Sequence, residues 1–248
     1  MKILVCISHV PDTTSKINFT NNNTEFDSNG ITYVINPYDE FGLTRAMIIK
    51  ETTGATITVI NVGPASTETS LRKALAIGAD NAVRINAEPT DANYVARLLA
   101  NYAKDENFDL IITGRESIDF NGGIVPGMLA TYLDMSFVNA CIGLELNGNL
   151  ATVIREIDGG KETLEGNLPM LIAGQKGLVE EKDLRIPAMR GIMMARKKPL
   201  TVIEASDAKK QTSVIEFDIP EAKSACTMIE AENIDQLVQL LHSEAKVI

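Results

Sequence analysis

Short apolar runs alternate with longer amphipathic segments along the first half of the chain. Runs rich in Val, Ile and Leu that end at Gly or polar residues are typical of buried parallel strands. Segments with apolar residues at i, i+3, i+4 and i+7 are typical of helices. Strands that alternate with such helices predict a mostly parallel, doubly wound α/β sheet. The predicted strands are 3–7, 55–62, 82–85 and 110–113, and the predicted helices are 37–53, 66–78, 91–104 and one carrying Met128, Leu129, Tyr132 and Leu133.

The alternation stops after Asp134, where strand-like runs follow one another without a helix between them. Asn147-Gly148 and Asp158-Gly159-Gly160 are strong hairpin turns. We therefore expect an antiparallel edge appended to the parallel sheet. The runs are 138–146, 151–157 and 168–173.

The last 70 or so residues predict an extended arm, since few regular elements are evident beyond Gly177 and residues 201–220 are polar. A final helix carries an apolar stripe. It either docks on a partner chain or returns to its own domain, and the pattern leaves both interpretations open. The stripe consists of Ile234, Leu237, Val238 and Leu241.

Three loops should meet at the carboxyl edge of the predicted sheet, at 8–13, 62–65 and 114–123, with 36–39 beside them. The loop from Arg115 to Gly123 ends in Asn-Gly-Gly and leads into a helix. A glycine-rich turn at a helix N-terminus presents free N–H groups and suits a phosphate. The alternative is a tight structural turn, because the loop matches neither GxGxxG nor a P-loop.

Candidate catalytic groups at this edge are few. Asp39 and Asp119 could form an acid–base pair, but Asp119 is better suited to hydrogen bonds with loop N–H groups or a ribose, and Asp39 to a helix cap. His9 could act as an acid or base, but a loop histidine without a carboxylate partner is usually polar surface. We therefore assign no catalytic residue.

Composition narrows the function classes. The 248 residues carry a net charge of −10, which argues against nucleic acid as the main partner. Three widely spaced cysteines and two histidines make a metal site improbable and fit reduced thiols in a cytoplasmic protein. No run of about 18 apolar residues occurs, so we expect no direct membrane insertion.

Positive charge concentrates in residues 185–198, RIPAMRGIMMARKK, on this acidic chain. Exposed Met side chains with basic neighbours suit an adaptable docking surface for an acidic partner, although a basic run is most often a solvated face. Arg155-Glu156, before the second hairpin turn, is either solvated hairpin chemistry or a pair that reaches across an interface.

Several motifs taken together resemble the β subunit of electron-transfer flavoproteins. The strongest matches are REIDGGKETLEGNLP at 155–169 and AMRGIMMARKKP at 188–199. The resemblance extends over nearly the whole chain. Supporting matches are VPDT at 10–13, INPYDE at 35–40, GPA at 63–65, ALAIGAD at 74–80 and ESID at 116–119.

The resemblance implies a heterodimer in which an α subunit carries the redox-active FAD. The pair would pass electrons from acyl-CoA dehydrogenases of fatty acid β-oxidation, and other dehydrogenases, to a membrane quinone oxidoreductase. The β subunit would be no catalyst itself. The resemblance further implies three parts of the chain: an adenine nucleotide α-hydrolase-like domain over 1–184, a dehydrogenase recognition loop over 185–198, and an arm packing on α over 199–248.

The resemblance also implies a nucleotide in the β subunit: a structural AMP in most members, a second FAD in electron-bifurcating ones. Thr13 falls where some members place a Tyr against the flavin. Met189 matches a hydrophobic anchor for the dehydrogenase, with Arg185, Arg196 and Lys197 around it, and Glu156 matches a glutamate that positions the flavin domain of α. The nucleotide-site positions are Cys6, Asn36, Pro37, Tyr38, Asp39, Val62, Gly63, Ser117, Asp119, Asn121, Gly122, Gly123, Ile124 and Val125.

The nucleotide loop departs from both family patterns. Residues 122–127, GGIVPG, lack the Asn, Gln and Thr side chains of AMP-binding members, and Val125-Pro126 is closer to the bifurcating pattern. Phosphate would then be held by backbone N–H groups. We predict AMP, with FAD as the alternative. Two other classes stay open: an adenine-nucleotide-sensing binding protein of the universal-stress type, and an enzyme acting on adenylates.

Overall fold

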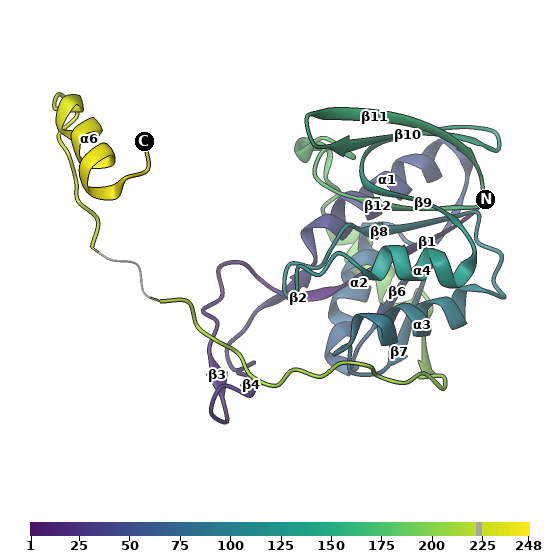
Figure 1. The fold of residues 1–248 in the computed structure, drawn as a ribbon. Helices are drawn as coiled ribbons and strands as arrows, with labels where there is room; N and C mark the ends of the chain where they lie inside the picture. The colour runs from purple at the N-terminus through teal and green to yellow at the C-terminus, as the bar shows by residue number, and fades with distance from the viewer. Residues whose placement is uncertain (222–224) are drawn as a thin grey trace.

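The computed structural model describes residues 1–221 and 225–248, and its body is built on one large twisted sheet (Figure 1). Within the described residues, nine strands follow the order β11-β10-β9-β12-β8-β1-β6-β7-β13. The parallel centre confirms the predicted doubly wound α/β fold. The strands of its first half are β1 Lys2–Cys6, β6 Thr56–Val62, β7 Asn81–Asn86 and β8 Leu110–Gly114.

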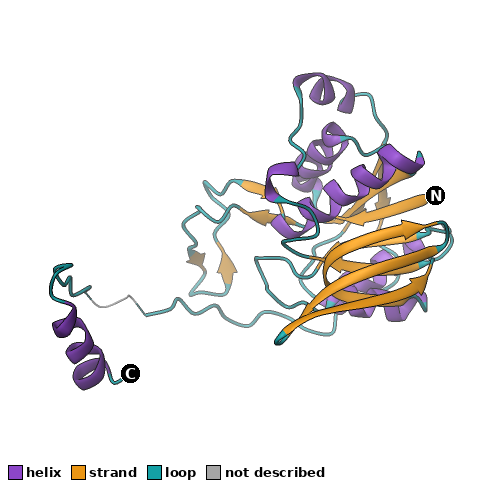
Figure 2. Ribbon diagram, turned by 90° about the horizontal axis from the view of Figure 1, so that it is seen from above, coloured by secondary structure: helices purple, strands orange, loops and turns teal. Residues whose placement is uncertain are grey.

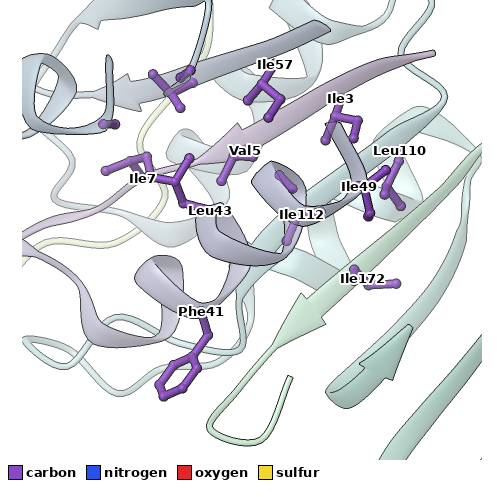
Figure 3. Packing of buried hydrophobic residues seen from close by; sticks show 14 of the residues in the cluster. Ile3, Val5, Ile7, Phe41, Leu43, Ile49, Ile57, Leu110, Ile112 and Ile172 are labelled. Carbon is purple, nitrogen blue, oxygen red and sulfur yellow. The ribbon is translucent and has the colours of Figure 1, made fainter. Parts of the chain in front are cut away.

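Helices cover both faces of the sheet because the central strands are apolar on both sides. Ile3 and Val5 pack under the first pair of helices, whereas Leu4 between them packs under the second pair. Figure 3 shows Leu43 and Ile49 lying over Ile3 and Val5. The first pair is α1 Pro37–Thr53 and α2 Glu68–Ile77, which follows the turn η1 Ala65–Thr67; the second is α3 Ala92–Ala103 and α4 Val125–Leu133.

The predicted antiparallel edge exists, with one correction. Strands β9 Ser136–Asn147, β10 Leu150–Ile157 and β11 Gly160–Asn167 form an antiparallel meander, seen at the lower right of Figure 2. Placing residues 168–173 in that edge was wrong, since β12 Met170–Gly174 lies between β8 and β9 and is parallel to both. All five residues of β12 are buried, as expected of a central parallel strand.

Regular structure continues beyond Gly177. The turn η2 Glu181–Asp183 and the short helix α5 Met189–Ala195 lead to β13 Leu200–Glu204, which pairs parallel with β7 at the other edge. The extended polar segment predicted from residue 201 therefore begins as a sheet strand. Its sequence, LTVIE, is short and follows a basic run, and three of its five residues are exposed, as an edge strand allows.

Excursions flank this body. Strand β2 His9–Pro11 pairs with β5 Tyr33–Ile35, and β3 Phe19–Thr20 pairs with β4 Glu25–Phe26 in the excursion between β2 and β5. After β13 the chain passes this hairpin and ends in α6 Ile234–Leu240 and the turn η3 Leu241–Ala245, away from the body (Figure 1). Ile234 is 64% exposed, so the stripe of α6 does not pack on its own domain. Across the two described ranges, no helix combines the length and apolar character needed to span a bilayer.

Candidate functional site

A cavity of about 400 Å³ lies at the carboxyl ends of β1, β6 and β8, where the three predicted loops meet. Nine of the fourteen residues proposed for a nucleotide line it. The other five lie outside its lining: Asn36, Pro37, Tyr38, Gly63 and Asn121. The nine lining residues are Cys6, Asp39, Val62, Ser117, Asp119, Gly122, Gly123, Ile124 and Val125.

Asp39 ties two of these loops together. Its two carboxylate oxygens accept hydrogen bonds from the backbone N–H of Ser8 at 2.7 Å and of Gly114 at 2.8 Å. The expectation that Asp39 caps its own helix was wrong, because both oxygens face neighbouring loops. Gly114 must be glycine here: a Cβ would lie 2.3 Å from Asp39 Oδ1.

Burial raises the pKa values of two side chains at the cavity, Asp39 and Cys6. It raises the pKa of Asp39 to about 7, although the hydrogen bonds from Ser8, Asn36 and Gly114 act in the opposite direction. Burial and the nearby Asp39 carboxylate raise the pKa of the Cys6 thiol far above its usual range, so this thiol is no nucleophile at neutral pH. With both oxygens of Asp39 engaged, the structure lends no support to an Asp39–Asp119 catalytic pair.

Asn36 fixes the glycine-rich loop from below. Its Nδ2 donates to Glu116 O at 2.9 Å, and its Oδ1 accepts from Ile118 N at 3.2 Å. Pro37 is the first residue of α1. The guanidinium carbon of Arg115 lies over the ring of Tyr38, 6.0 Å from the ring centroid. These residues shape the cavity from behind its lining.

The loop itself offers backbone donors. Asn121 and Gly123 have φ of 48° and 62°, so the chain turns sharply before α4. Asp119 Oδ1 accepts from Phe120 N at 2.9 Å, which is the predicted loop hydrogen bond. Ile124 precedes α4 and makes no side-chain cap, which leaves first-turn N–H groups of the helix for an anion.

The lining is acidic: among the described residues around the cavity, four are carboxylates and none is Lys or Arg. His9 adds no positive charge, since burial lowers its pKa below the usual 6.5. Its Nδ1 pairs with Ser70 Oγ at 2.8 Å and its ring stacks on Tyr33, so it is not the polar surface residue expected. The carboxylates are Asp39, Asp91, Glu116 and Asp119.

Two parts of the lining escaped the sequence analysis. Asn61 was detectable as the polar residue in an apolar strand; its Nδ2 donates to Ile7 O at 2.8 Å, while its buried Oδ1 has no partner. Such an acceptor suits an amino group, such as that of adenine. Residues 212–214 come from the arm, and no local signal pointed to them.

The predicted docking surface is a short helix rather than a loop. Gly191 of α5 packs so closely on α2 that a Cβ would lie 2.3 Å from Ala76 O. Arg72 of α2 donates to Ala195 O at 2.8 Å. Met189 is 75% exposed, and Arg196 and Lys197, directly after α5, are exposed as well.

The remaining predicted contacts lie at the surface of the body. Arg185 pairs with Glu51 at 3.0 Å, and Thr13 is exposed in the turn after β2. Glu156 of β10 accepts a hydrogen bond from Gln175, whose Oε1 accepts from Arg115 Nη1 at 3.0 Å. Glu156 is therefore linked to the loop of the cavity. No cluster of three metal-binding side chains occurs in the part of the chain that the structure describes.

The sheet and its cavity define a class of protein: an α/β domain that receives a ligand where parallel strands end. The model of the "Electron transfer flavoprotein domain" family matches residues 24–208. The chain is 38% identical over 262 residues to "Electron transfer flavoprotein subunit beta" of Bacillus subtilis, covering 100% of both chains. The same-named protein of Syntrophomonas wolfei is 36% identical (94% and 91% covered), and that of Bos taurus 31% (93% and 93%).

The chain therefore belongs to the electron transfer flavoprotein beta subunit family, a family of electron carrier proteins. The resemblance predicted from the motifs is confirmed. Membership favours an electron carrier over the universal-stress type and over an enzyme acting on adenylates.

Proposed function

We propose that the chain pairs with an electron transfer flavoprotein α subunit and holds a structural AMP in the cavity of about 400 Å³. The heterodimer would carry electrons from acyl-CoA and other dehydrogenases to a quinone oxidoreductase. The observation that carries the proposal is this cavity at the sheet edge of a full-length family member.

The cavity favours a mononucleotide over FAD on two grounds. Its volume lies toward the lower end of the range of about 300–1,000 Å³ typical of ligand sites. Its lining has four carboxylates and no Lys or Arg, so each further phosphate adds repulsion that no side chain offsets. AMP has a single phosphate, which the N–H groups around Gly122, Gly123 and the start of α4 can bind. It is therefore repelled less by the carboxylates than the two phosphates of FAD would be.

This chain would bind AMP and help to position the flavin domain of the α subunit, while the flavin carries out the redox chemistry. FAD, when bound in the heterodimer, supplies the electron-accepting group. The exposed stripe of α6 suits the α subunit, and Met189 suits an apolar pocket of a dehydrogenase. Glu156, held by Gln175, would orient the flavin domain, and Thr13 would face it.

A second FAD in the cavity is the alternative, since Val125-Pro126 is closer to the bifurcating pattern. To decide, the chain is co-expressed with its α partner, the complex is denatured, and the released nucleotides are separated by chromatography. One FAD and one AMP per heterodimer are expected. Two FAD and no AMP would favour the bifurcating alternative, and one FAD alone would contradict a nucleotide in the β subunit.

A further inference from the structure

Residues 210–217, here called the strap, follow β13 and pass along the cavity. Three strap residues, Thr212, Ser213 and Val214, line the cavity. The strap is fixed at both ends, while residues 211–216 are exposed. Figure 1 shows this segment running from the β13 edge past the β3–β4 hairpin.

The near end is fixed by Asp91, the residue before α3, which is 3% exposed. Its Oδ1 accepts from Tyr94 N at 2.6 Å and caps the helix. Its Oδ2 accepts from Gln211 N at 3.1 Å and from Thr212 N and Oγ1, both at 2.7 Å. One oxygen therefore serves the helix and the other serves the strap. Although burial opposes it, hydrogen bonding from Thr212, Tyr94 and Gln211 lowers the pKa of Asp91, so the acceptor is ionised at neutral pH.

The far end is fixed on the N-terminal excursion. Phe217 stacks on Phe19 with ring centroids 4.6 Å apart, and Phe217 N donates to Asn23 O at 2.7 Å. Because the strap is held at these two points and little is buried between them, it can open without unfolding the sheet.

We propose that the strap is the closing wall of the ligand cavity and that Asp91 is the positioning residue that latches it. Ligand then leaves when the strap detaches from Oδ2 of Asp91. The identity of the ligand as a nucleotide rests on the proposed function, but the closure of the cavity does not.

The test separates the two oxygens of Asp91. Asp91→Asn and Asp91→Ser both retain a helix cap but remove the second carboxylate oxygen. Heterodimer containing radiolabelled AMP is chased with unlabelled AMP, and release is expected to be at least tenfold faster in both variants than in wild type. Loss of negative charge alone would slow the release of an anion, so faster release reports the lost latch. Phe217→Ala, which releases the far end, should also accelerate release.

Asp105→Asn is the matched control, since this exposed residue beyond the other end of α3 undergoes the same charge change. Its release rate should equal wild type. Unchanged release in both Asp91 variants, or equal acceleration in Asp105→Asn, would overturn the latch.

A second measurement needs no bound nucleotide. Asp91 accepts hydrogen bonds from the strap amides of Gln211 and Thr212. Hydrogen exchange of the amides of residues 211–214 in nucleotide-stripped heterodimer, followed by mass spectrometry, should be at least fivefold faster in Asp91→Asn than in wild type. If the complex contains no AMP, the proposed ligand is wrong and this rate still tests the strap; an unchanged rate would overturn it.

Discussion

The cavity loops bury polar side chains, whereas the helices α5 and α6 expose apolar ones. Asn36 and Asp39 are 0% and 3% exposed, and their polar atoms bond to neighbouring loops. Met189 and Ile234 are apolar and yet 75% and 64% exposed. The cavity is thus completed within this chain, whereas the exposed helices are surfaces that only a partner can cover. Changes at the cavity should therefore cost stability, and changes at the helices should cost only association.

The largest effect is expected for Asp39→Ala. It leaves the N–H groups of Ser8 and Gly114 without acceptors, and each unpaired buried donor costs about 1–3 kcal/mol. We expect the free energy of unfolding to fall by about 4 kcal/mol, measured by chemical denaturation of the purified complex followed by circular dichroism. Asp119→Ala is the control, because its carboxylate serves an exposed N–H, and it should cost under about 1 kcal/mol. Equal losses would mean that Asp39 does not fix the loops.

A pH series tests the same carboxylate. The pKa of Asp39 is about 7 in the folded chain and near its ordinary value of 3.8 when unfolded, so the folded state binds more protons between these values. Its contribution to stability is complete below about pH 4 and is lost as pH rises through 7, by up to about 4 kcal/mol. Asp39→Asn should remove this slope. The measurement is denaturation of both proteins from pH 4.5 to 8; parallel curves would contradict the assignment.

A medium effect is expected at α6. Leu237→Asp places a charge on the exposed apolar stripe and should weaken binding of the α subunit at least tenfold, which is about 1.4 kcal/mol. Stability of the body should not change, since α6 contributes no buried residue. Gln239→Asp adds the same charge at a polar position of the helix and should bind as wild type does. Surface plasmon resonance gives both affinities, and an unaffected Leu237→Asp would rule out α6 as the docking surface.

The smallest effect is expected at α5. Met189→Ala should slow reduction of the flavin by a dehydrogenase several-fold, because the exposed side chain loses its apolar contact with the partner. Affinity for α and the free energy of unfolding should remain as in wild type. Met228→Ala, another exposed methionine, provides the stopped-flow control. Identical kinetics for the two variants would remove Met189 from the docking role.

Local patterns were sufficient for most elements. The helix from Pro37 to Thr53 begins at a proline and ends at Gly54, whose φ of 69° suits a glycine stop. The hairpin at Asn147-Gly148 and the central strands likewise follow from neighbours in sequence, because turn chemistry and periodicity act over a few residues. The convergence of three loops followed from one further rule, that parallel strands end at the same edge.

Tertiary structure decided what depends on distant partners. Strand β12 enters the parallel centre only because β8 and β9 offer it two edges, and β13 pairs with β7 although most of its residues are exposed. The predicted helix-capping role of Asp39 was wrong, because its carboxylate oxygens accept hydrogen bonds from N–H groups of loops that lie 31 and 75 residues away in the chain. Thr212 reaches the cavity through Asp91, 121 residues earlier in the chain. Sequence by itself determined most of the elements up to β12 and the family, since these rest on local spacing and motifs. Which side chains close the cavity was decided by packing, because hydrogen bonds between distant segments leave no periodic trace in the sequence.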